Sequence, residues 1–568
     1  MRKLQLYGRK KRKMAIHRTP LLGKTKRVIS KNQKRNKERM KTRQLFKTHL
    51  LSFAAICSMV LATASCANED IAQNGTGGNK DKNFTTFVTG EPTKTRTSMD
   101  YNDGAFYWEE GDKIYVKDDD GHWQTSNAVD AAHAHSASFT FKVPGKFNNS
   151  GSYKVYYPGK NGSNNQVSIP ASQTQTEPNT TKHFGESGDC GTADATGTIG
   201  GKVFSFQLNH QASILVFQPS TNNDVLKHCY LTKIEVSSNN DITDTYTLDP
   251  TNGELTGTGS GKTIELTTKG SGTYANGFPL NTTSPNIALN GAYMFIKPGP
   301  HILKVRYWVK DMVTGTEGTV TKILSSFNYQ KNTYYDMTAN LNIRDYDGGQ
   351  YYMWDAKDQY WKGWEWTTNL SDRQPTVNDE KGENYPKTNG DSRWYSEVYP
   401  GYNVQNDASK NSLFTALPNV NVMVWYAMKG DPRWDAEELW TTMGHLYKGG
   451  MWFLKKEKIA SKNSTTTAAM ANADPNGIDW RKTGKVESNT TLNSGQPSAG
   501  EIGNYFYLPA LGDYGDGKLT SLQSKGYFWS ASGNPIDPKG AYALNFESGS
   551  VTVRYYYRSH GFRVQTFE

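Results

Sequence analysis

The sequence predicts a mainly β protein, in which a region of antiparallel β-sandwiches is followed by an α+β domain. Three observations support this prediction. The 568 residues are 35% hydrophobic and 12% aromatic, with 53 glycines, a mixture that favours β-structure over helical bundles. Short alternating segments fill residues 84–343, and the pattern changes from Asp345 onward.

Residues 84–343 read as short strands separated by Gly, Asn, Asp and Pro. Most of them alternate apolar with polar residues, which is typical of antiparallel sheets with one face in water. No helix is expected here, and the length allows two successive sandwiches. The expected strands are 84–88, 105–108, 113–116, 138–143, 153–157, 203–208, 213–217, 233–236, 263–268, 292–296 and 302–309.

Residues 345–568 hold 11 of the 14 tryptophans and longer loops. One helix is expected at Asp435–Tyr447, because Asp435 with Glu438 resembles a capping box and Gly449 follows the segment. Its apolar stripe is Leu439, Met443 and Leu446. The expected strands are 525–532, 541–546, 550–557 and 561–567.

The net charge of +11 is unevenly distributed. Residues 1–65 contain 19 Lys and Arg and one acidic residue, Glu38, which gives +18; the rest has 65 − 19 = 46 basic and 54 − 1 = 53 acidic residues, which gives −7. The basic block could be a nucleic-acid-binding arm or the start of an export signal. The apolar segment that follows, residues 50–64, has the length of a signal core and is short for a membrane span, so we expect export and no nucleic-acid partner.

Cys66 follows this core after small residues and resembles the lipidated cysteine of a lipobox, although Thr63 stands where Leu is usual. The alternative is an ordinary secretory signal. Residues 67–70 (ANED) resemble the acidic stretch that routes lipoproteins of Bacteroidetes to the outer face of the outer membrane. Residues 1–65 are thus read as a basic extension plus a lipoprotein signal peptide, with translation starting at Met40, and residues 66–83 as a flexible tether.

Two further cysteines, Cys190 and Cys229, lie in the body of the chain. An oxidising compartment permits a disulfide between them, and two buried free thiols are an equal alternative. The sequence has no Cys/His spacing for a metal, no nucleotide-binding fingerprint and no catalytic-serine motif, so no metal, cofactor or catalytic residue is expected.

Five strings in the first part of the chain occur in a recognisable order: TRTSMD (95–100), FYWEEGD (106–112), IPASQTQ (169–175), GDCGTA (188–193) and FSFQLNHQASIL (204–215). On these strings, residues 84–343 resemble the fimbrillin-like (Mfa-like) family of pilus subunits and surface lipoproteins. The resemblance implies a pair of β-sandwiches that can accept a donor strand from another subunit through an exposed sheet edge. It also implies proteolysis in an early loop, for which Arg96 is a candidate and an ordinary surface arginine the alternative.

A second set of strings lies near the end of the chain: YFWSAS (527–532), Ala541-Tyr542, Asn545-Phe546, Ser548-Gly549 and RSHGFRV (558–564). On these strings, residues 345–568 resemble C-type-lectin-like modules, are similar to the Fibrobacter major paralogous domain, and more distantly resemble formylglycine-generating-enzyme-like domains. This resemblance implies a ligand-binding domain. The oxidase chemistry of the last group needs cysteines, which this part lacks, and the calcium-binding strings of lectins are incomplete at 496–498 and 533–535.

The run at the end of the last long strand is the candidate ligand-binding site, because Tyr and Arg dominate binding hot spots. Alternation would place Tyr555 and Tyr557 on one face and Arg554, Tyr556 and Arg558 on the other. Packing in a core is an equally weighted alternative, and diversification by a retroelement, as in lectin-like variable proteins, is a further one. The candidate residues are Trp529, Arg554, Tyr555, Tyr556, Tyr557, Arg558, Ser559 and His560.

The sequence therefore predicts a surface-exposed outer-membrane lipoprotein, anchored through Cys66, that acts as a pilus-tip or solitary adhesin. Its partners would be an unidentified glycan or protein and, by donor-strand addition, other pilus subunits. The alternative is a structural stalk or anchor subunit without a ligand of its own. Carboxylates near tryptophans (Asp355, Asp358 and Glu365) could suggest a glycoside-hydrolase cleft, but no spacing of paired acids supports it, so no enzyme is expected.

Overall fold

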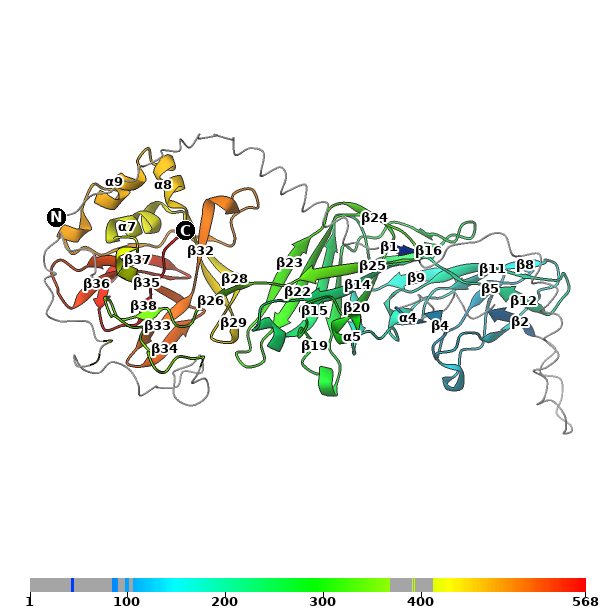
Figure 1. Ribbon diagram of the computed structural model, residues 1–568. Coiled ribbons are helices and arrows are strands. Elements are labelled where there is room, and N and C mark those ends of the chain that lie inside the picture. The colour runs from blue at the N-terminus through cyan, green and yellow to red at the C-terminus, as the bar shows by residue number, and fades with distance from the viewer. Residues whose placement is uncertain are drawn as a thin grey trace, which may run out of the picture.

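The structure is a computed structural model that describes residues 42–44, 84–89, 98–101, 106–367, 391, 393 and 412–568. Cys66, the predicted tether (66–83), Arg96 and most of the predicted signal region (1–65) lie outside these residues. The prediction of a mainly β protein is confirmed. The elements form three groups along one line: most of those between 84 and 210 at one end, those between 213 and 340 together with a few earlier strands such as β10 (Ser172–Gln175) in the middle, and those from 344 at the other end (Figure 1).

The first group is one eight-stranded sheet that curls around an aromatic core. Its two ends meet where the backbone N–H of Asn127 donates to the carbonyl of Lys142, at 3.2 Å. The core includes the fully buried side chains of Phe87, Trp108 and Phe141. The strand order is β6 (Trp123–Thr125), β5 (Tyr115–Lys117), β8 (Ser152–Tyr157), β11 (Gly191–Gly197), β12 (Val203–Phe206), β2 (Phe84–Thr89) and β7 (Thr140–Pro144), with β13 (Asn209–His210) beside β11.

The middle group has two main sheets that share one core. The first is β10 (Ser172–Gln175), β18 (Thr263–Thr268), β15 (Tyr230–Ser238), β22 (Leu303–Lys310) and β23 (Glu317–Ile323), with β19 (Phe278–Pro279) beside β15. The second is β1 (Thr42–Gln44), β25 (Thr333–Asn340), β14 (Ser213–Ser220) and β20 (Ala292–Ile296). Smaller elements around them are β3 (Ser98–Met99), β4 (Phe106–Tyr107), β9 (Gln166–Ile169), β16 (Asp244–Leu248), β17 (Leu255–Thr256), β21 (Gly299–His301), β24 (Phe327–Tyr329), α4 (Phe184–Ser187) and α5 (Ile287–Asn290).

The expectation of purely antiparallel pairing is wrong for three strand pairs in these two groups. β2 runs parallel to β12, β10 to β18, and β14 to β25. In each pair the two strands are separated by many residues, which gives the chain the long crossover that parallel pairing requires. The one-turn helices α4 and α5 also occur where no helix was expected.

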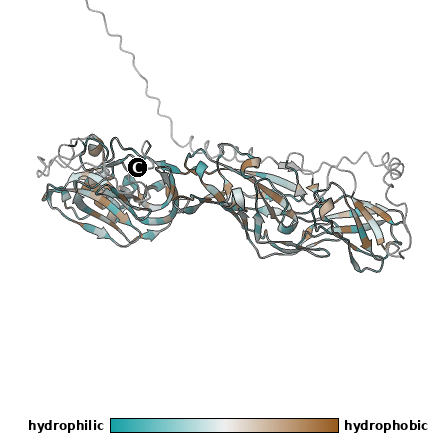
Figure 2. Ribbon diagram, turned by 90° about the horizontal axis from the view of Figure 1, so that it is seen from below, coloured by the Kyte–Doolittle hydropathy of each residue, from teal (hydrophilic) through white to brown (hydrophobic). Residues whose placement is uncertain are grey.

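The third group combines two sheets with four helices. One sheet is β26 (Arg344–Tyr346), β28 (Arg433–Thr442), β29 (His445–Leu454) and β32 (Tyr505–Pro509), with β31 (Asn493–Ser494) beside β28. The other is β27 (Tyr351–Tyr352), β38 (Phe562–Arg563), β35 (Lys525–Gly533), β36 (Gly540–Glu547), β37 (Ser550–Tyr557) and β30 (Glu487–Asn489), joined by β33 (Leu511–Gly515) and β34 (Lys518–Leu522). The helices are α6 (Ser412–Thr415), α7 (Val420–Lys429), α8 (Lys456–Lys462) and α9 (Thr467–Asn472); α7, α8 and α9 lie together on one side (Figure 1). Figure 2 shows hydrophobic residues on strands of all three groups.

The predicted helix at Asp435–Tyr447 is wrong, because these residues form the hairpin β28–β29. Its tight turn is Met443-Gly444, both with positive φ (48° and 78°), which suits the twist of a two-residue hairpin. Asp435 does bind backbone N–H groups as a helix cap would, but it does so within a strand. Its Oδ1 accepts hydrogen bonds from the backbone N–H of Glu437 and Glu438 at an irregularity in β28.

The β28–β29 hairpin docks onto the middle group. Asp311, which follows β22, accepts hydrogen bonds from His445 Nδ1 at 3.2 Å and from the backbone N–H of Leu446 at 3.0 Å. Burial alone would raise the pKa of Asp311, but the hydrogen bonds from His445, Leu446 and Val313 outweigh it and lower that pKa to about 2. Leu439 and Leu446 complete the apolar core of the middle group, so the contact is both polar and hydrophobic.

Cys190 and Cys229 are both buried free thiols, so of the two alternatives the structure has the unbridged one. Cys229 Sγ donates to the carbonyl of Val225 at 3.5 Å. Burial raises the pKa of Cys229 to about 12, and burial together with the Asp189 carboxylate raises the pKa of Cys190 well above its usual range. Neither thiol is therefore ionised or accessible at neutral pH.

We expect both thiols to resist alkylation by iodoacetamide at pH 8 in the folded protein and to react fully in denaturant. The thiolate is the reactive form, and folding suppresses it at both positions. Peptide mass spectrometry after alkylation reads each cysteine separately. A disulfide would instead leave both unmodified in denaturant until a reductant is added.

Candidate ligand-binding surface

Strand β37 carries most of the residues predicted to bind a ligand. It pairs along its whole length with β36, whereas β30 pairs only with Val551–Val553. In the part of the chain that the structure describes, no strand pairs with this edge beyond Val553. The second half of β37 therefore lies at an open sheet edge.

Alternation places the side chains of β37 on two faces, as the sequence predicts. Val553 and, in part, Tyr555 pack into the core that contains α7. Tyr557 follows on the same face and is 64% exposed. Arg554 and Tyr556 lie on the opposite face, where the guanidinium carbon is 5.1 Å from the centre of the tyrosine ring.

Five rings on the Arg554 face contact one another, and we call them the aromatic cluster. The ring centre of Phe562 lies 5.0 Å from that of Tyr556, 4.8 Å from that of Tyr527 and 4.4 Å from that of Trp529. Ala541 and Ala543, the partners of Tyr556 and Arg554 on β36, are small enough to let the rings meet above the sheet. The members of the aromatic cluster are Tyr527, Trp529, Tyr556, His560 and Phe562.

Solvent reaches this face at a limited set of side chains. Arg554 is exposed, whereas Tyr527, Tyr556 and His560 are half-buried. Burial, with the carboxylates Asp513 and Glu547 nearby, raises the pKa of Tyr527 to about 12, and burial also raises the pKa of Tyr556. Both phenols thus stay protonated at neutral pH and can donate hydrogen bonds to a ligand.

Two residues predicted to contact a ligand are fully buried. Trp529 stacks on Phe562, and its indole N–H donates to the carbonyl of Tyr352 at 2.8 Å. The Arg558 side chain lies over Trp354, at 4.3 Å from the ring centre, and its Nε donates to the carbonyl of Gly540 at 2.9 Å. Both residues are therefore corrected from contact residues to supports of the sheet beneath the surface.

The structure adds Tyr527 to the candidate site and keeps Ser559, which is exposed in the turn after β37. Tyr527 is two residues before Trp529 on β35, so alternation places both on one face. That signal was present in the sequence. The ring contacts that join Tyr527 to Tyr556 depend on cross-strand register, which the sequence does not reveal.

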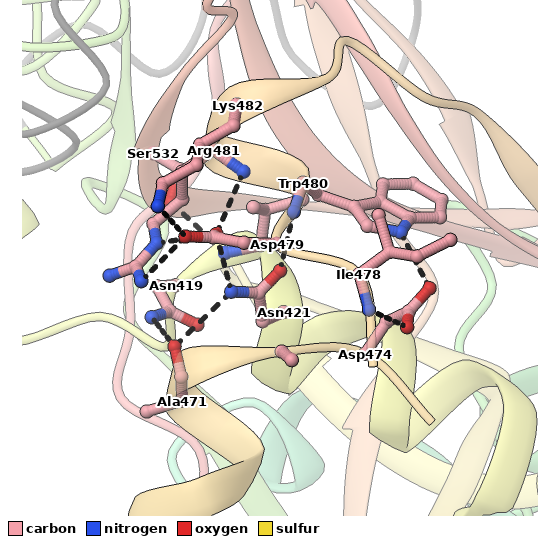
Figure 3. Close-up of polar contacts among 12 residues, drawn as sticks. Asn419, Asn421, Ala471, Asp474, Ile478, Asp479, Trp480, Arg481, Lys482 and Ser532 are labelled. Carbon is pink, nitrogen blue, oxygen red and sulfur yellow. Dashed lines mark hydrogen bonds and ion pairs between the residues drawn. The ribbon is translucent and has the colours of Figure 1, made fainter. Parts of the chain in front are cut away.

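A buried polar network supports this sheet from the other side (Figure 3). Asn421 of α7 is fully buried, donates to Asp479 Oδ1 at 2.9 Å and accepts from the backbone N–H of Trp480 at 2.9 Å. Asp474 Oδ2 accepts from the indole N–H of Trp480 at 2.8 Å. The network thus holds the segment 474–480 against the helix.

The same network reaches β35, because the backbone N–H of Val420 at the start of α7 donates to Ser532 Oγ at 3.1 Å. Asp479 is bound by Arg481 Nε at 2.7 Å, and this ion pair lowers the pKa of Asp479 although burial opposes the shift. Its carboxylate is therefore already paired within the chain. We read the network as a structural support that keeps the sheet with the candidate residues rigid.

The carboxylates that could suggest a hydrolase are held by local partners. Asp358 pairs with Lys362 at 2.8 Å. Glu365 accepts from Gln359 Nε2 and from the backbone N–H of Gly363, both at 2.9 Å, and these bonds outweigh burial and lower its pKa. A general acid needs a raised pKa, so Glu365 is poorly suited to that role.

One group of side chains could hold a metal ion, at the other end of the molecule. Asp118, Asp120 and His122 bring one ligand atom each within 4.8 Å of one another. The oxygens of Asp118, however, accept hydrogen bonds from the backbone N–H of Asp120 and His122 and from Gln124 Nε2. This carboxylate already has partners, and the loop needs no ion to hold it.

Within the described residues, the helices lack the length and apolar character needed to cross a bilayer.

No protein-family model and no curated protein matches the sequence. Similar solved structures include candidate cell adhesion proteins from Bacteroides ovatus (13% identity, 45% of this chain and 92% of that one, TM-score 0.29) and Bacteroides uniformis (15%, 46% and 94%, TM-score 0.27). The fimbrial anchor protein Mfa2 from Porphyromonas gingivalis is another (10% identity, 42% and 82% coverage, TM-score 0.20). These descriptions belong to those proteins, so we derive a function for this chain from its own residues.

Proposed function

We propose that this chain is a surface-exposed lipoprotein of the bacterial outer membrane, anchored through Cys66, that acts as an adhesin at a pilus tip or alone. Its ligand, a cell-surface glycan or protein, would bind to the exposed side of the aromatic cluster together with Arg554 and Ser559. The observation that carries the proposal is this set of tyrosine, histidine and arginine side chains, half-buried to exposed, on a supported sheet. Such rigid amphipathic groups provide large contact area at low entropic cost.

The position of the surface supports an adhesin. The tether from Cys66 would enter the fold at Phe84, the first residue of β2, and β2 lies in the end group opposite to β37 (Figure 1). Three groups of sheets in a row thus hold the aromatic cluster away from the anchored end. A ligand on another cell would meet this end first.

Two observations bear on a role within a pilus. Phe567 is buried in the core, and Glu568 accepts a hydrogen bond from the Tyr426 hydroxyl at 2.6 Å, so residues 562–568 are not available to a neighbouring subunit. Among the described strands, β25 pairs on one edge of its sheet with β1 alone, whose residues belong to the predicted signal region (1–65) that export would remove. The exported chain would then offer that edge for strand addition, which supports accepting rather than donating a strand.

A bacterium carrying Arg554→Ala and Tyr556→Ala together is expected to lose adhesion to its target cells at least tenfold, because truncating hot-spot residues costs about 2 kcal/mol or more each. Adhesion is counted after washing, and an antibody against the first group measures surface display. Tyr557→Ala is the matched control, because it removes an equally large exposed tyrosine from the opposite face.

Unchanged adhesion in the double variant, with normal display, would contradict the adhesin proposal. It would favour the structural stalk or anchor subunit, for which the open β25 edge is the specific support. In that case deletion of the gene should shorten or release pili, while both substitutions leave the pili intact. The two functions therefore give opposite results in the same strains.

A further inference from the structure

We propose that the surface around Arg554 recognises the carboxylate of an acidic glycan, with the aromatic cluster packing against the sugar ring. This inference rests on the proposed ligand-binding function and names the ligand class. It starts from the charges on the Arg554 face. In the described part of the chain, Arg554 has no ion pair and no hydrogen bond to its guanidinium, and its partner on β36 is the buried Ala543.

The other charged groups near the aromatic cluster already have partners. Lys525 Nζ pairs with Glu547 at 2.8 Å. Asp513 accepts a hydrogen bond from Thr520 Oγ1 at 3.1 Å and lies 3.8 Å from His560 Nδ1. Within the described residues, Arg554 is thus a cation that has no carboxylate at ion-pair distance, which favours an anionic group on the ligand.

Arg554 is also held in a useful orientation. The guanidinium carbon lies over the Tyr556 ring, 5.1 Å from its centre, and within the described residues no hydrogen bond occupies its N–H groups. A planar carboxylate matches the N–H groups of a guanidinium with two parallel hydrogen bonds. Contact with the tyrosine ring reduces the freedom that Arg554 would lose on binding.

The groups around Arg554 favour a sugar over a long polyanion. The half-buried rings of Tyr527 and Tyr556 offer apolar surface for the C–H face of a pyranose, and their protonated hydroxyls can bond its oxygens. The chain without its leader carries −7 overall, which disfavours nucleic acid. The negative chain repels a polyanion over a long range, whereas a sugar with a single carboxylate experiences much less repulsion and can still pair with Arg554.

The test compares galacturonic acid with its methyl ester, which removes the charge and keeps the sugar, and sialyllactose with lactose. Calorimetry uses the full exported chain. We expect the acidic form of at least one pair to bind about tenfold to a hundredfold more tightly than its neutral counterpart. Arg554→Gln should abolish this ratio and Arg554→Lys should retain part of it. Lys304→Gln, which removes an exposed cation from β22, should leave the ratio unchanged.

Equal binding of acid and ester, or a ratio that survives Arg554→Gln, would overturn the inference. Binding of a neutral glycan or of a peptide that is lost in the Arg554→Ala, Tyr556→Ala variant would also overturn it, while leaving the adhesin function intact. Absence of all glycan binding would overturn it too; cell adhesion in the double variant then decides the proposed function separately.

Discussion

Trp529→Ala is expected to lower the free energy of unfolding of the third group by about 3–5 kcal/mol, the cost of truncating a large aromatic side chain in a core. The indole is fully buried, stacks on Phe562 and donates to the carbonyl of Tyr352. Its loss leaves a cavity and removes one hydrogen bond from that carbonyl. Denaturant unfolding measures the change in the free energy of unfolding. Hydrogen exchange of the amides in β35 and β38 then shows where protection is lost.

Tyr557→Ala is the control for this prediction, because its side chain is 64% exposed and should change stability by no more than about 0.5 kcal/mol. Comparing these two variants also distinguishes a structural role of Trp529 from a role in contacting the ligand. If Trp529→Ala kept the native stability and lost only ligand binding, Trp529 would belong to the contact surface, as the sequence suggested.

Asp311→Ala is expected to reduce the free energy that holds the β28–β29 hairpin docked by about 3 kcal/mol. The substitution removes a buried carboxylate with several charge-assisted hydrogen bonds. The partners left without an acceptor include His445 and the backbone N–H of Leu446. Faster hydrogen exchange at Leu446 and a broader distribution of shapes in X-ray scattering should both report it. Asp224→Ala, which removes a carboxylate that is 91% exposed, is the control and should change neither.

The same contact predicts a pH dependence. The folded pKa of Asp311, about 2, lies below its ordinary value of 3.8, so ionisation of this group stabilises docking. The stabilisation is present above pH 4 and is lost as the pH falls from 4 through 2. The protection factor of the Leu446 amide, which corrects the exchange rate for its intrinsic pH dependence, should therefore fall over that interval in the wild type. An equal fall in Asp311→Ala would assign the effect to another group.

Prediction from sequence succeeded where strand alternation and solvent exposure agreed. The strands 550–557 and 263–268 have the predicted boundaries, because each has one face in a core and turn residues at both ends. The faces of Arg554 and Tyr555 follow from the same alternation. Local chemistry was sufficient for these elements.

Prediction failed where tertiary contacts override local pattern. The segment 420–429 is apolar on nearly every side and β-branched, which obscures helical periodicity, yet it forms the helix α7 because packing buries it almost completely. Conversely, the cap-like Asp435 and the stripe from Leu439 to Leu446 serve a hairpin whose leucines fill the core of another group. The burial of Trp529 and Arg558 depends on β38 and on Trp354, which are distant in sequence.

The docked hairpin gives the molecule a defined path for mechanical force. In the proposed adhesin, a cell held in flow would pull on a ligand at β37 and on the anchor at the opposite end, so tension would pass from the third group to the middle one. The chain crosses between them at β26, whose hydrogen bonds to β28 run across a parallel pair. Tension along β26 therefore loads these bonds together in shear instead of opening them one by one. The hairpin contact at Asp311 lies beside that crossing and shares the load, so the junction should resist stretching better than a plain linker.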